Sequence, residues 1–132
     1  MKQIEIKAAI ENLIDTFLYA GKVSIELRKK GLIKEIKEDN TPVSNGDLEV
    51  NRILTEKINN LTPQIPIVSE ETSHNKSKKD LKNFWLIDPI DGTYDYINDL
   101  DEFTLNAGLI INNRAVAGII YAPAKNRLFY SY

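Results

Sequence analysis

The last part of the chain contains three apolar runs that are separated by short polar turns. The runs cover residues 103–111, 115–121 and 128–132 and are rich in β-branched and aromatic side chains, which favour strands. Asn112-Asn113-Arg114 joins the first two runs, and asparagine tolerates the positive φ that a tight hairpin requires. The pattern predicts an antiparallel meander whose last strand, residues 128–132, is an uncovered and exposed edge.

Two amphipathic helices are expected before this meander. Apolar residues recur at three- and four-residue spacing between residues 3 and 30, and Gly31 follows as a helix-ending residue. A short strand is expected at 33–37. Ser44 and Asp47 have the spacing of a capping box, which predicts a second helix that begins near Ser44. Gly21 inside the first helix indicates either a break or a close contact.

Two helices followed by a mostly antiparallel sheet indicate an α+β layered domain, with the helices packed on the sheet. The length of 132 residues is that of a single domain. The net charge of -2 provides no overall positive potential that would attract a nucleic acid polymer. No apolar run approaches the ~18 residues of a membrane span, and the N-terminus lacks the apolar region of a signal peptide. We therefore expect no membrane span and a cytoplasmic location.

Acidic residues collect where two apolar runs end. Residues 84–87 lead directly into Asp88-Pro89-Ile90-Asp91-Gly92-Thr93, and Glu70-Glu71 closes the run at 65–68. Two carboxylates about 4 Å apart repel by ~4 kcal/mol at an effective dielectric constant of ~20, so a cluster of them favours a bound cation. The chain has no Cys, and oxygen ligands favour Mg²⁺, Mn²⁺ or Ca²⁺ over zinc.

Each of these residues also has a simpler interpretation. Asp88 and Asp91 could merely build a turn, because Asp-Pro and Asp-Gly are common turn dipeptides. Glu70-Glu71 could be a solvated strand end, Asp47 a helix-capping acid, and Thr93 the cap of a short turn at 93–97. The polar stretch at 72–82 is expected to be a mobile surface loop that exposes the only histidine, His74, and Lys76, Lys78 and Lys79.

Three segments taken in order carry a family resemblance: Thr41-Pro42-Val43-Ser44-Asn45-Gly46-Asp47, Pro66-Ile67-Val68-Ser69-Glu70-Glu71, and Trp85 through Thr93. They resemble the inositol monophosphatase superfamily of Mg²⁺-dependent, lithium-sensitive phosphomonoesterases. Gly108, Glu102 to Asn106, and Tyr121-Ala122-Pro123 are most similar to its CysQ-type 3'(2'),5'-bisphosphate nucleotidases. The chain differs at Tyr94-Asp95-Tyr96, where nucleotidases of this type usually carry Lys-Glu-Phe or Lys-Glu-Tyr.

The resemblance implies a metal site and a catalytic pair. The implied metal ligands are the side chains of Glu70, Asp88 and Asp91 and the backbone carbonyl of Ile90. The implied groups for catalysis and phosphate binding are Asp47 and Thr93, which with Glu70 orient and activate water, the backbone N–H groups of Gly92 and Thr93, and Glu71, which contacts the site through water. The implied cofactor is Mg²⁺, with Mn²⁺ as an alternative and Li⁺ or Ca²⁺ as inhibitors.

The implied activity is hydrolysis of 3'-phosphoadenosine 5'-phosphate, a small phosphorylated substrate, to AMP and phosphate. Family members are longer, so residues 1–132 are expected to be the amino-terminal domain of this sugar phosphatase fold, with weak or no turnover in the absence of the carboxy-terminal domain. One alternative is an inositol or sugar monophosphate phosphatase. Another is a non-catalytic metal-binding fragment that forms a homodimer through its exposed sheet edge.

Overall fold

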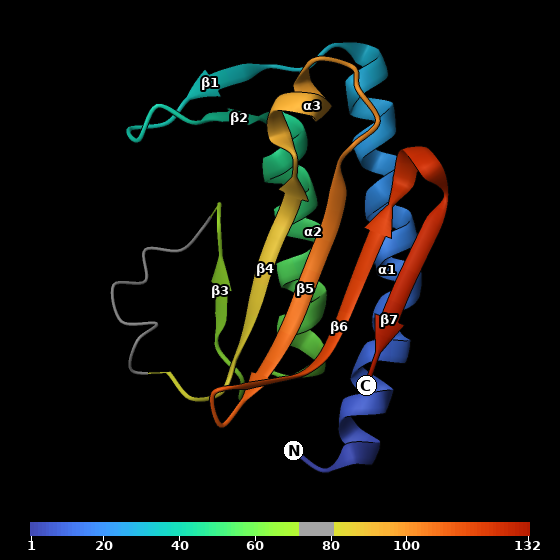
Figure 1. The fold of residues 1–132 in the computed structure, drawn as a ribbon, viewed down its shortest axis with the longest axis vertical. Coiled ribbons are helices and arrows are strands. Elements are labelled where there is room, and N and C mark those ends of the chain that lie inside the picture. Colours follow the sequence, from blue (N-terminus) through green and yellow to red (C-terminus); the bar gives the residue numbers. More distant parts are fainter. Residues whose placement is uncertain (72–80) are drawn as a thin grey trace.

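The computed structural model describes residues 1–71 and 81–132 (Figure 1). The elements are α1 (Gln3–Lys30), β1 (Lys34–Ile36), β2 (Pro42–Ser44), α2 (Asn45–Leu61), β3 (Ile67–Ser69), β4 (Phe84–Asp91), α3 (Thr93–Ile97), β5 (Thr104–Ile111), β6 (Arg114–Ala122), the 3₁₀ turn η2 (Pro123–Lys125) and β7 (Arg127–Ser131). Both predicted helices and the short strand at 33–37 are confirmed. His74, Lys76, Lys78 and Lys79 lie outside the described residues.

The main sheet has five strands in the order β3-β4-β5-β6-β7. The strands β5, β6 and β7 form the predicted antiparallel meander, and β4 pairs antiparallel to β5. Strand β3, by contrast, pairs parallel to β4. The parallel register brings Ser69, the last residue of β3, opposite Ile87. The residues that follow β3 therefore lie beside the second half of β4, at the end of the sheet where α3 begins (Figure 1).

Helices α1 and α2 cover one face of this sheet, as Figure 1 shows. Alternate residues of the strands point toward the helices, because side chains in a strand alternate between its two faces. The largest fully buried side chains between the two layers include Phe17 of α1, Leu54 of α2, Trp85 of β4 and Leu105 of β5. The indole N–H of Trp85 donates a hydrogen bond to Oγ1 of Thr62 over 2.9 Å, which satisfies the only polar atom of that side chain.

Helix α1 is continuous through Gly21. A Cβ atom at position 21 would lie 2.2 Å from the ring of Tyr121 on β6, so glycine allows the strand to approach the helix closely. Of the two interpretations of Gly21, the close contact is confirmed, and its partner is a strand. The helix ends at Gly31, whose φ of 97° is one that residues with a side chain rarely adopt.

Helix α2 begins with the predicted capping box. The Ser44 hydroxyl accepts a hydrogen bond from the Asp47 N–H, and the Asp47 carboxylate accepts one from the Ser44 N–H. Ser44 is also the last residue of β2, which pairs with β1 in a small antiparallel hairpin. The hairpin extends from the end of the molecule that carries α3 (Figure 1).

The second face of the main sheet carries no helix among the described residues. Leu86, Ile120 and Phe129 are 42%, 44% and 51% exposed, and together with Gly108 and Gly118 they line a shallow groove of about 470 Å³. Strand β7 is an edge strand, as predicted. Association of this edge with a second copy of the chain stays a prediction.

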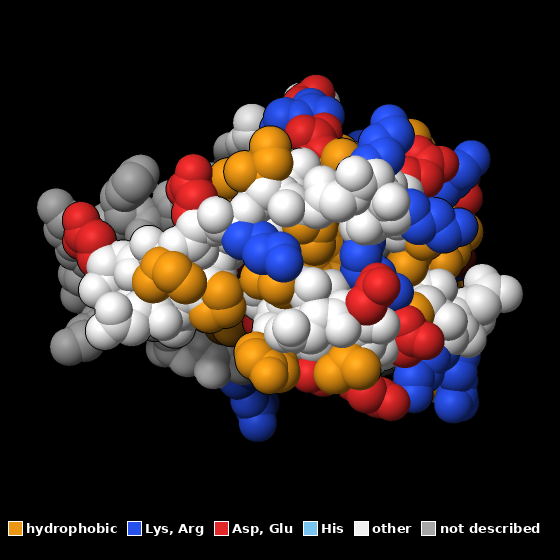
Figure 2. All heavy atoms as spheres, turned by 90° about the horizontal axis from the view of Figure 1, so that it is seen from above, with side chains coloured by type: hydrophobic (Ala, Val, Ile, Leu, Met, Phe, Trp, Pro, Cys, Tyr) orange, Lys and Arg blue, Asp and Glu red, His pale blue; other side chains and the backbone are white. Residues whose placement is uncertain are grey.

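The end of the molecule that carries α3 has a mixed surface. Figure 2 looks onto this end and shows acidic, basic and hydrophobic side chains side by side. No broad basic face is visible from this side, in agreement with the net charge of -2. Among the described residues, none of the helices is long and apolar enough to cross a membrane.

Candidate functional site

The predicted acidic residues meet where β3 and β4 end. Glu70 directly follows β3, and its backbone N–H donates a hydrogen bond to the Ile87 carbonyl over 3.2 Å. This bond extends the parallel pairing by one residue and brings Glu70 next to Asp88. Parallel strands end at the same edge of a sheet, which is why two acidic segments that are separated in sequence come together here.

The neighbouring carboxylates change the pKa of Asp88. Its pKa is raised from 3.8 to about 6, first by burial and then by the negative charges of Asp91, Glu70, Glu71 and Asp47. Both causes disfavour the ionised form, because burial removes water and each neighbouring carboxylate repels the charge. The other four carboxylates therefore lie within electrostatic range of Asp88.

A bulge between Asp88 and Asp91 explains how these two residues come to share a site. Asp88 pairs with Asn106 of β5 and Asp91 pairs with Thr104, so three steps on β4 match two steps on β5. In a regular strand, residues three apart point to opposite faces, and one extra residue restores a common face. The motif spacing alone gave no indication of this bulge, although Pro89 within a strand is a typical sign of one.

Ser69 fixes the end of β3 to α2. Its hydroxyl donates a hydrogen bond to the Asn51 side-chain oxygen, and both residues are buried. The same hydroxyl oxygen accepts a hydrogen bond from the Glu71 N–H over 3.3 Å. The two glutamates therefore follow a strand end that is held by a helix.

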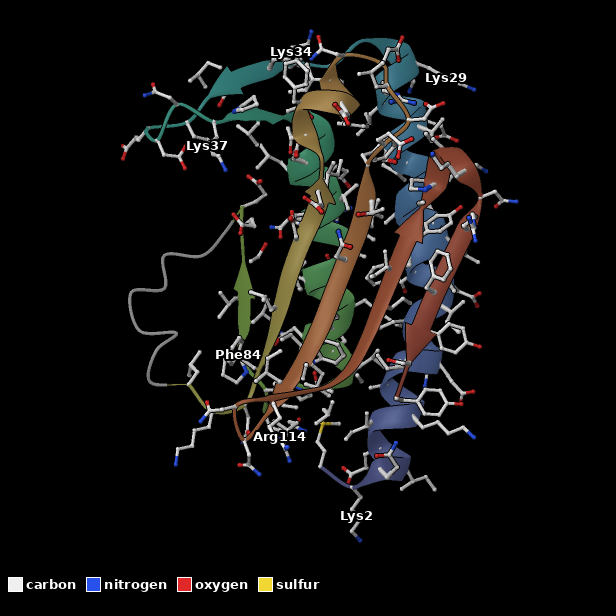
Figure 3. The ribbon with its side chains drawn as sticks, in the orientation of Figure 1. Lys2, Lys29, Lys34, Lys37, Phe84 and Arg114 are labelled. Carbon is white, nitrogen blue, oxygen red and sulfur yellow. The ribbon has the colours of Figure 1, made fainter. Side chains whose placement is uncertain are left out.

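Glu71 is paired with a lysine that the sequence did not single out. The Lys37 ammonium group lies 3.7 Å from the Glu71 carboxylate, whose side chain is only 7% exposed. Burial raises the pKa of Glu71, while Lys37 acts in the opposite direction. Lys37 is labelled in Figure 3 on the β1–β2 hairpin, above the end of β3. Lys37 is far from Glu71 in the sequence, so this pair could be predicted only if the position of the β1–β2 hairpin were already known.

Asp47 and Thr93 are in direct contact. The Thr93 hydroxyl lies 2.8 Å from Oδ1 of Asp47 and 3.1 Å from the Ile90 carbonyl, and can donate to either. Oδ2 of Asp47 accepts hydrogen bonds from the N–H and the hydroxyl of Ser44. The carboxylate of Asp47 is thus both the cap of α2 and the partner of Thr93, so the two interpretations of this residue are compatible.

The turn between β4 and α3 depends on Gly92. Its φ is 90°, and a Cβ atom there would lie 2.6 Å from the Glu102 carbonyl oxygen. Only glycine fits a position with both of these properties. The turn leads into Thr93, the first residue of α3, and places Gly92 and Thr93 directly after Asp91.

The carboxylates are neighbours, but they do not form a closed cage. In the part of the chain that the structure describes, no three acidic or histidine side chains are arranged tightly enough to hold one metal ion. Carboxylate oxygens that repel one another are nevertheless a donor set that suits Mg²⁺ or Mn²⁺.

Known proteins are similar to this chain in sequence and in fold. The model of the Inositol monophosphatase family matches residues 6–132. The 3'(2'),5'-bisphosphate nucleotidase CysQ of Haemophilus influenzae is 40% identical over 114 residues, which are 85% of this chain and 42% of that protein. The chain thus spans less than half the length of this relative.

Solved structures give the same result for the fold. An IMPase from Thermotoga maritima aligns with a TM-score of 0.81 and 25% identity, over 92% of this chain and 47% of that one. An IMPase/NADP phosphatase complexed with Mg²⁺ and phosphate aligns with a TM-score of 0.78 and 20% identity, over the same shares of the two chains. The fold predicted from the resemblance is confirmed, and the chain belongs to the inositol monophosphatase family.

Proposed function

We propose that this chain carries the metal-binding and water-activating residues of a CysQ-type phosphomonoesterase, which hydrolyses 3'-phosphoadenosine 5'-phosphate to AMP and phosphate. The main support is the convergence at the end of β4, where burial and four neighbouring carboxylates raise the pKa of Asp88 to about 6. The nucleotidase activity named for the Haemophilus influenzae relative supports the substrate class. In this proposal residues 1–132 form an amino-terminal domain.

Mg²⁺ fits the residues of this site. The side chains of Glu70, Asp88 and Asp91 and the backbone carbonyl of Ile90 would hold it, with Mn²⁺ as an alternative and Li⁺ or Ca²⁺ as inhibitors. A structure of the same fold contains Mg²⁺ and phosphate. When bound, Mg²⁺ lowers the pKa of a coordinated water and offsets charge on the transferred phosphoryl group.

The chain's own residues would orient the water and the substrate. The Thr93 hydroxyl, which donates to Asp47, can at the same time accept a hydrogen bond from water on its remaining lone pair. A proton that leaves this water would move toward the Thr93 hydroxyl as the Asp47 carboxylate draws on the hydroxyl proton. Glu70 would help to orient the same water, and Glu71 would contact the site through another one. The backbone N–H groups of Gly92 and Thr93 would hold the phosphate.

A second candidate function is hydrolysis of an inositol or sugar monophosphate. Tyr94 supports this alternative, because an uncharged side chain that is 69% exposed stands where nucleotidases of this type usually have a lysine. Without that cation, the turn after Gly92 has less charge to offer a second phosphate group.

Phosphate release under matched conditions tests the proposal. The chain would be incubated with Mg²⁺ and one substrate in each of three parallel reactions: 3'-phosphoadenosine 5'-phosphate, an inositol monophosphate or a sugar monophosphate. Each substrate would carry a radiolabel in the phosphate group to be released, so that slow turnover can be detected. We expect slow, Mg²⁺-dependent release that is fastest from the nucleotide. Full-length CysQ of Haemophilus influenzae would be the reference, and it should be much faster.

Two variants show whether the activity comes from this site. Asp47→Asn and Thr93→Val should each abolish the release, whereas Asp15→Asn, at an exposed acid on α1, should leave it unchanged. Preference for the inositol or sugar ester would replace the nucleotidase proposal by the second candidate. Release that survives both site variants would refute the assignment of this site.

A further inference from the structure

Tyr96 is a fully buried residue at the junction of all three helices. Its hydroxyl donates a hydrogen bond to the backbone carbonyl of Ser24, in the interior of α1, over 2.7 Å. Burial raises the pKa of Tyr96, and the nearby negative charge of Asp47 adds to the effect. The hydroxyl therefore stays protonated and acts as a donor that fixes α3 to α1.

The ring of Tyr96 also sets the distance between α3 and the first turn of α2. A Cβ atom at Gly46 would lie 2.1 Å from the Tyr96 hydroxyl oxygen and 2.7 Å from the ring carbons beside it. The ring therefore rests directly on the backbone of Gly46. The next residue is Asp47, the partner of Thr93.

Thr93 and Tyr96 are one helical turn apart on α3. Residues three apart lie on the same side of a helix, and here that side faces the first turn of α2. Thr93 contacts Asp47, while Tyr96 contacts Gly46. A shift of the Tyr96 ring would thus move Thr93 relative to the carboxylate that it contacts.

Arg28 of α1 holds the residues that follow α3. Its guanidinium group lies 5.0 Å from the centre of the Phe103 ring and 5.7 Å from that of Tyr96. It also donates hydrogen bonds to the Leu100 carbonyl over 2.6 Å and to Asp101 over 3.0 Å. Because the Phe103 and Tyr96 rings are in contact, with centres 4.8 Å apart, α1 holds both Tyr96 and the residues that follow α3.

We propose that Tyr96 is a positioning residue for the Thr93–Asp47 pair, and that its hydroxyl, anchored on Ser24, keeps the two oxygens at hydrogen-bonding distance. The inference rests on the proposed function in one respect, namely that this pair orients the attacking water. The geometry of the pair itself can be measured without any turnover.

The test uses the metal-free chain with ¹³C-labelled aspartate. The NMR signal of the Asp47 carboxyl carbon reports the hydrogen bonds that this group accepts, and Thr93→Val gives the signal without the Thr93 bond. Tyr96→Phe retains the ring and removes the hydroxyl, and we expect it to shift the Asp47 signal toward that of Thr93→Val. Tyr121→Phe, at a tyrosine of similar burial that packs on Gly21, should leave the signal where it is in the wild type.

An Asp47 signal that is unchanged in a folded Tyr96→Phe variant would overturn the proposal and leave Tyr96 with a packing role only. If that variant does not fold, Gly46→Ala perturbs the same contact from the α2 side and should shift the Asp47 signal as well. An unchanged signal in Gly46→Ala would also overturn the proposal. Failure of the proposed function would look different, because phosphate release would then survive in Asp47→Asn and Thr93→Val although the NMR shifts are present.

Discussion

The Thr93 hydroxyl and Oδ1 of Asp47 lie 2.8 Å apart, although the two residues are separated by 46 positions in the chain. The contact joins the turn after β4 to the first turn of α2. The Asp47 carboxylate therefore has two roles. It caps α2 through Ser44, and in the proposed function it acts with Thr93 on the attacking water.

Loss of this hydrogen bond should destabilise the fold modestly. Thr93→Val replaces the hydroxyl by a methyl group and leaves an oxygen of the buried Asp47 carboxylate without its donor, at a cost of roughly 1–3 kcal/mol. Thr93→Ser should recover most of the loss because it restores the hydroxyl. Urea unfolding would measure the free energies, with Thr16→Val on α1 as the control. Equal effects of the valine and serine variants at position 93 would contradict the role of the hydrogen bond.

Divalent cations should stabilise the chain. Mg²⁺ or Mn²⁺ that binds among Glu70, Asp88 and Asp91 binds the folded state in preference to the unfolded one, so it should raise the melting temperature as its concentration increases. Asp88→Asn should abolish the rise, and Asp15→Asn should retain it. A rise of equal size in the Asp88→Asn variant would place the bound cation elsewhere.

Asp88 should also make the stability of the metal-free chain depend on pH. Its pKa in the folded chain, about 6, is above the ordinary value of 3.8, so the folded state binds the proton more tightly than the unfolded state does. Its contribution to stability is fully present below pH 3.8 and is lost as the pH rises through 6. Relative to Asp88→Asn, the wild type should therefore become less stable over this range. Unfolding in the presence of a chelator would measure the difference, and parallel pH curves for the two proteins would refute the prediction.

The Ser69–Asn51 hydrogen bond should matter both for stability and for metal binding. Ser69→Ala leaves the buried Asn51 oxygen without its donor, at a cost of about 1–3 kcal/mol. Because Glu70 follows directly, the variant should also weaken the Mg²⁺-dependent rise in melting temperature. Ser131→Ala, on the exposed edge strand β7, is the control. A destabilised Ser69→Ala protein with an unchanged response to Mg²⁺ would show that the bond supports the fold alone.

Gly92→Ala should be among the most damaging single-methyl additions. The new Cβ atom would be 2.6 Å from the Glu102 carbonyl at a φ of 90°, so both a steric clash and an unfavourable backbone conformation oppose it. Gly118→Ala, where the nearest atom is 3.5 Å away, provides a matched comparison. Thermal unfolding should show a much larger loss at position 92, and similar losses at both positions would argue against strain at this turn.

Much of the fold could be predicted from the sequence because its determinants are local. Helical spacing predicted α1, the capping box predicted the start of α2, and Asn112-Asn113 predicted a tight turn, in which both residues have positive φ. The parallel pairing of β3 with β4 was not predicted, since a three-residue strand does not reveal which strand is its neighbour.

The candidate site could be predicted only in part for the same reason. The acidic residues and the Asp47–Thr93 pair were identified from motifs and a family resemblance, and the structure brings Asp47 and Thr93 together. Their roles as ligands and catalytic groups stay a prediction. The contacts of Lys37 with Glu71 and of Tyr96 with Ser24 join residues 34 and 72 positions apart, and nothing in the local sequence indicates such pairs.

Trp85 offers a practical consequence of the way in which the helices cover the sheet. It is the only tryptophan of the chain, it is fully buried in the core, and its indole is hydrogen-bonded to Thr62. Its intrinsic fluorescence therefore comes from a single, dry environment between α2 and β4. A red shift of the emission will follow the opening of this interface directly, without any added dye or label.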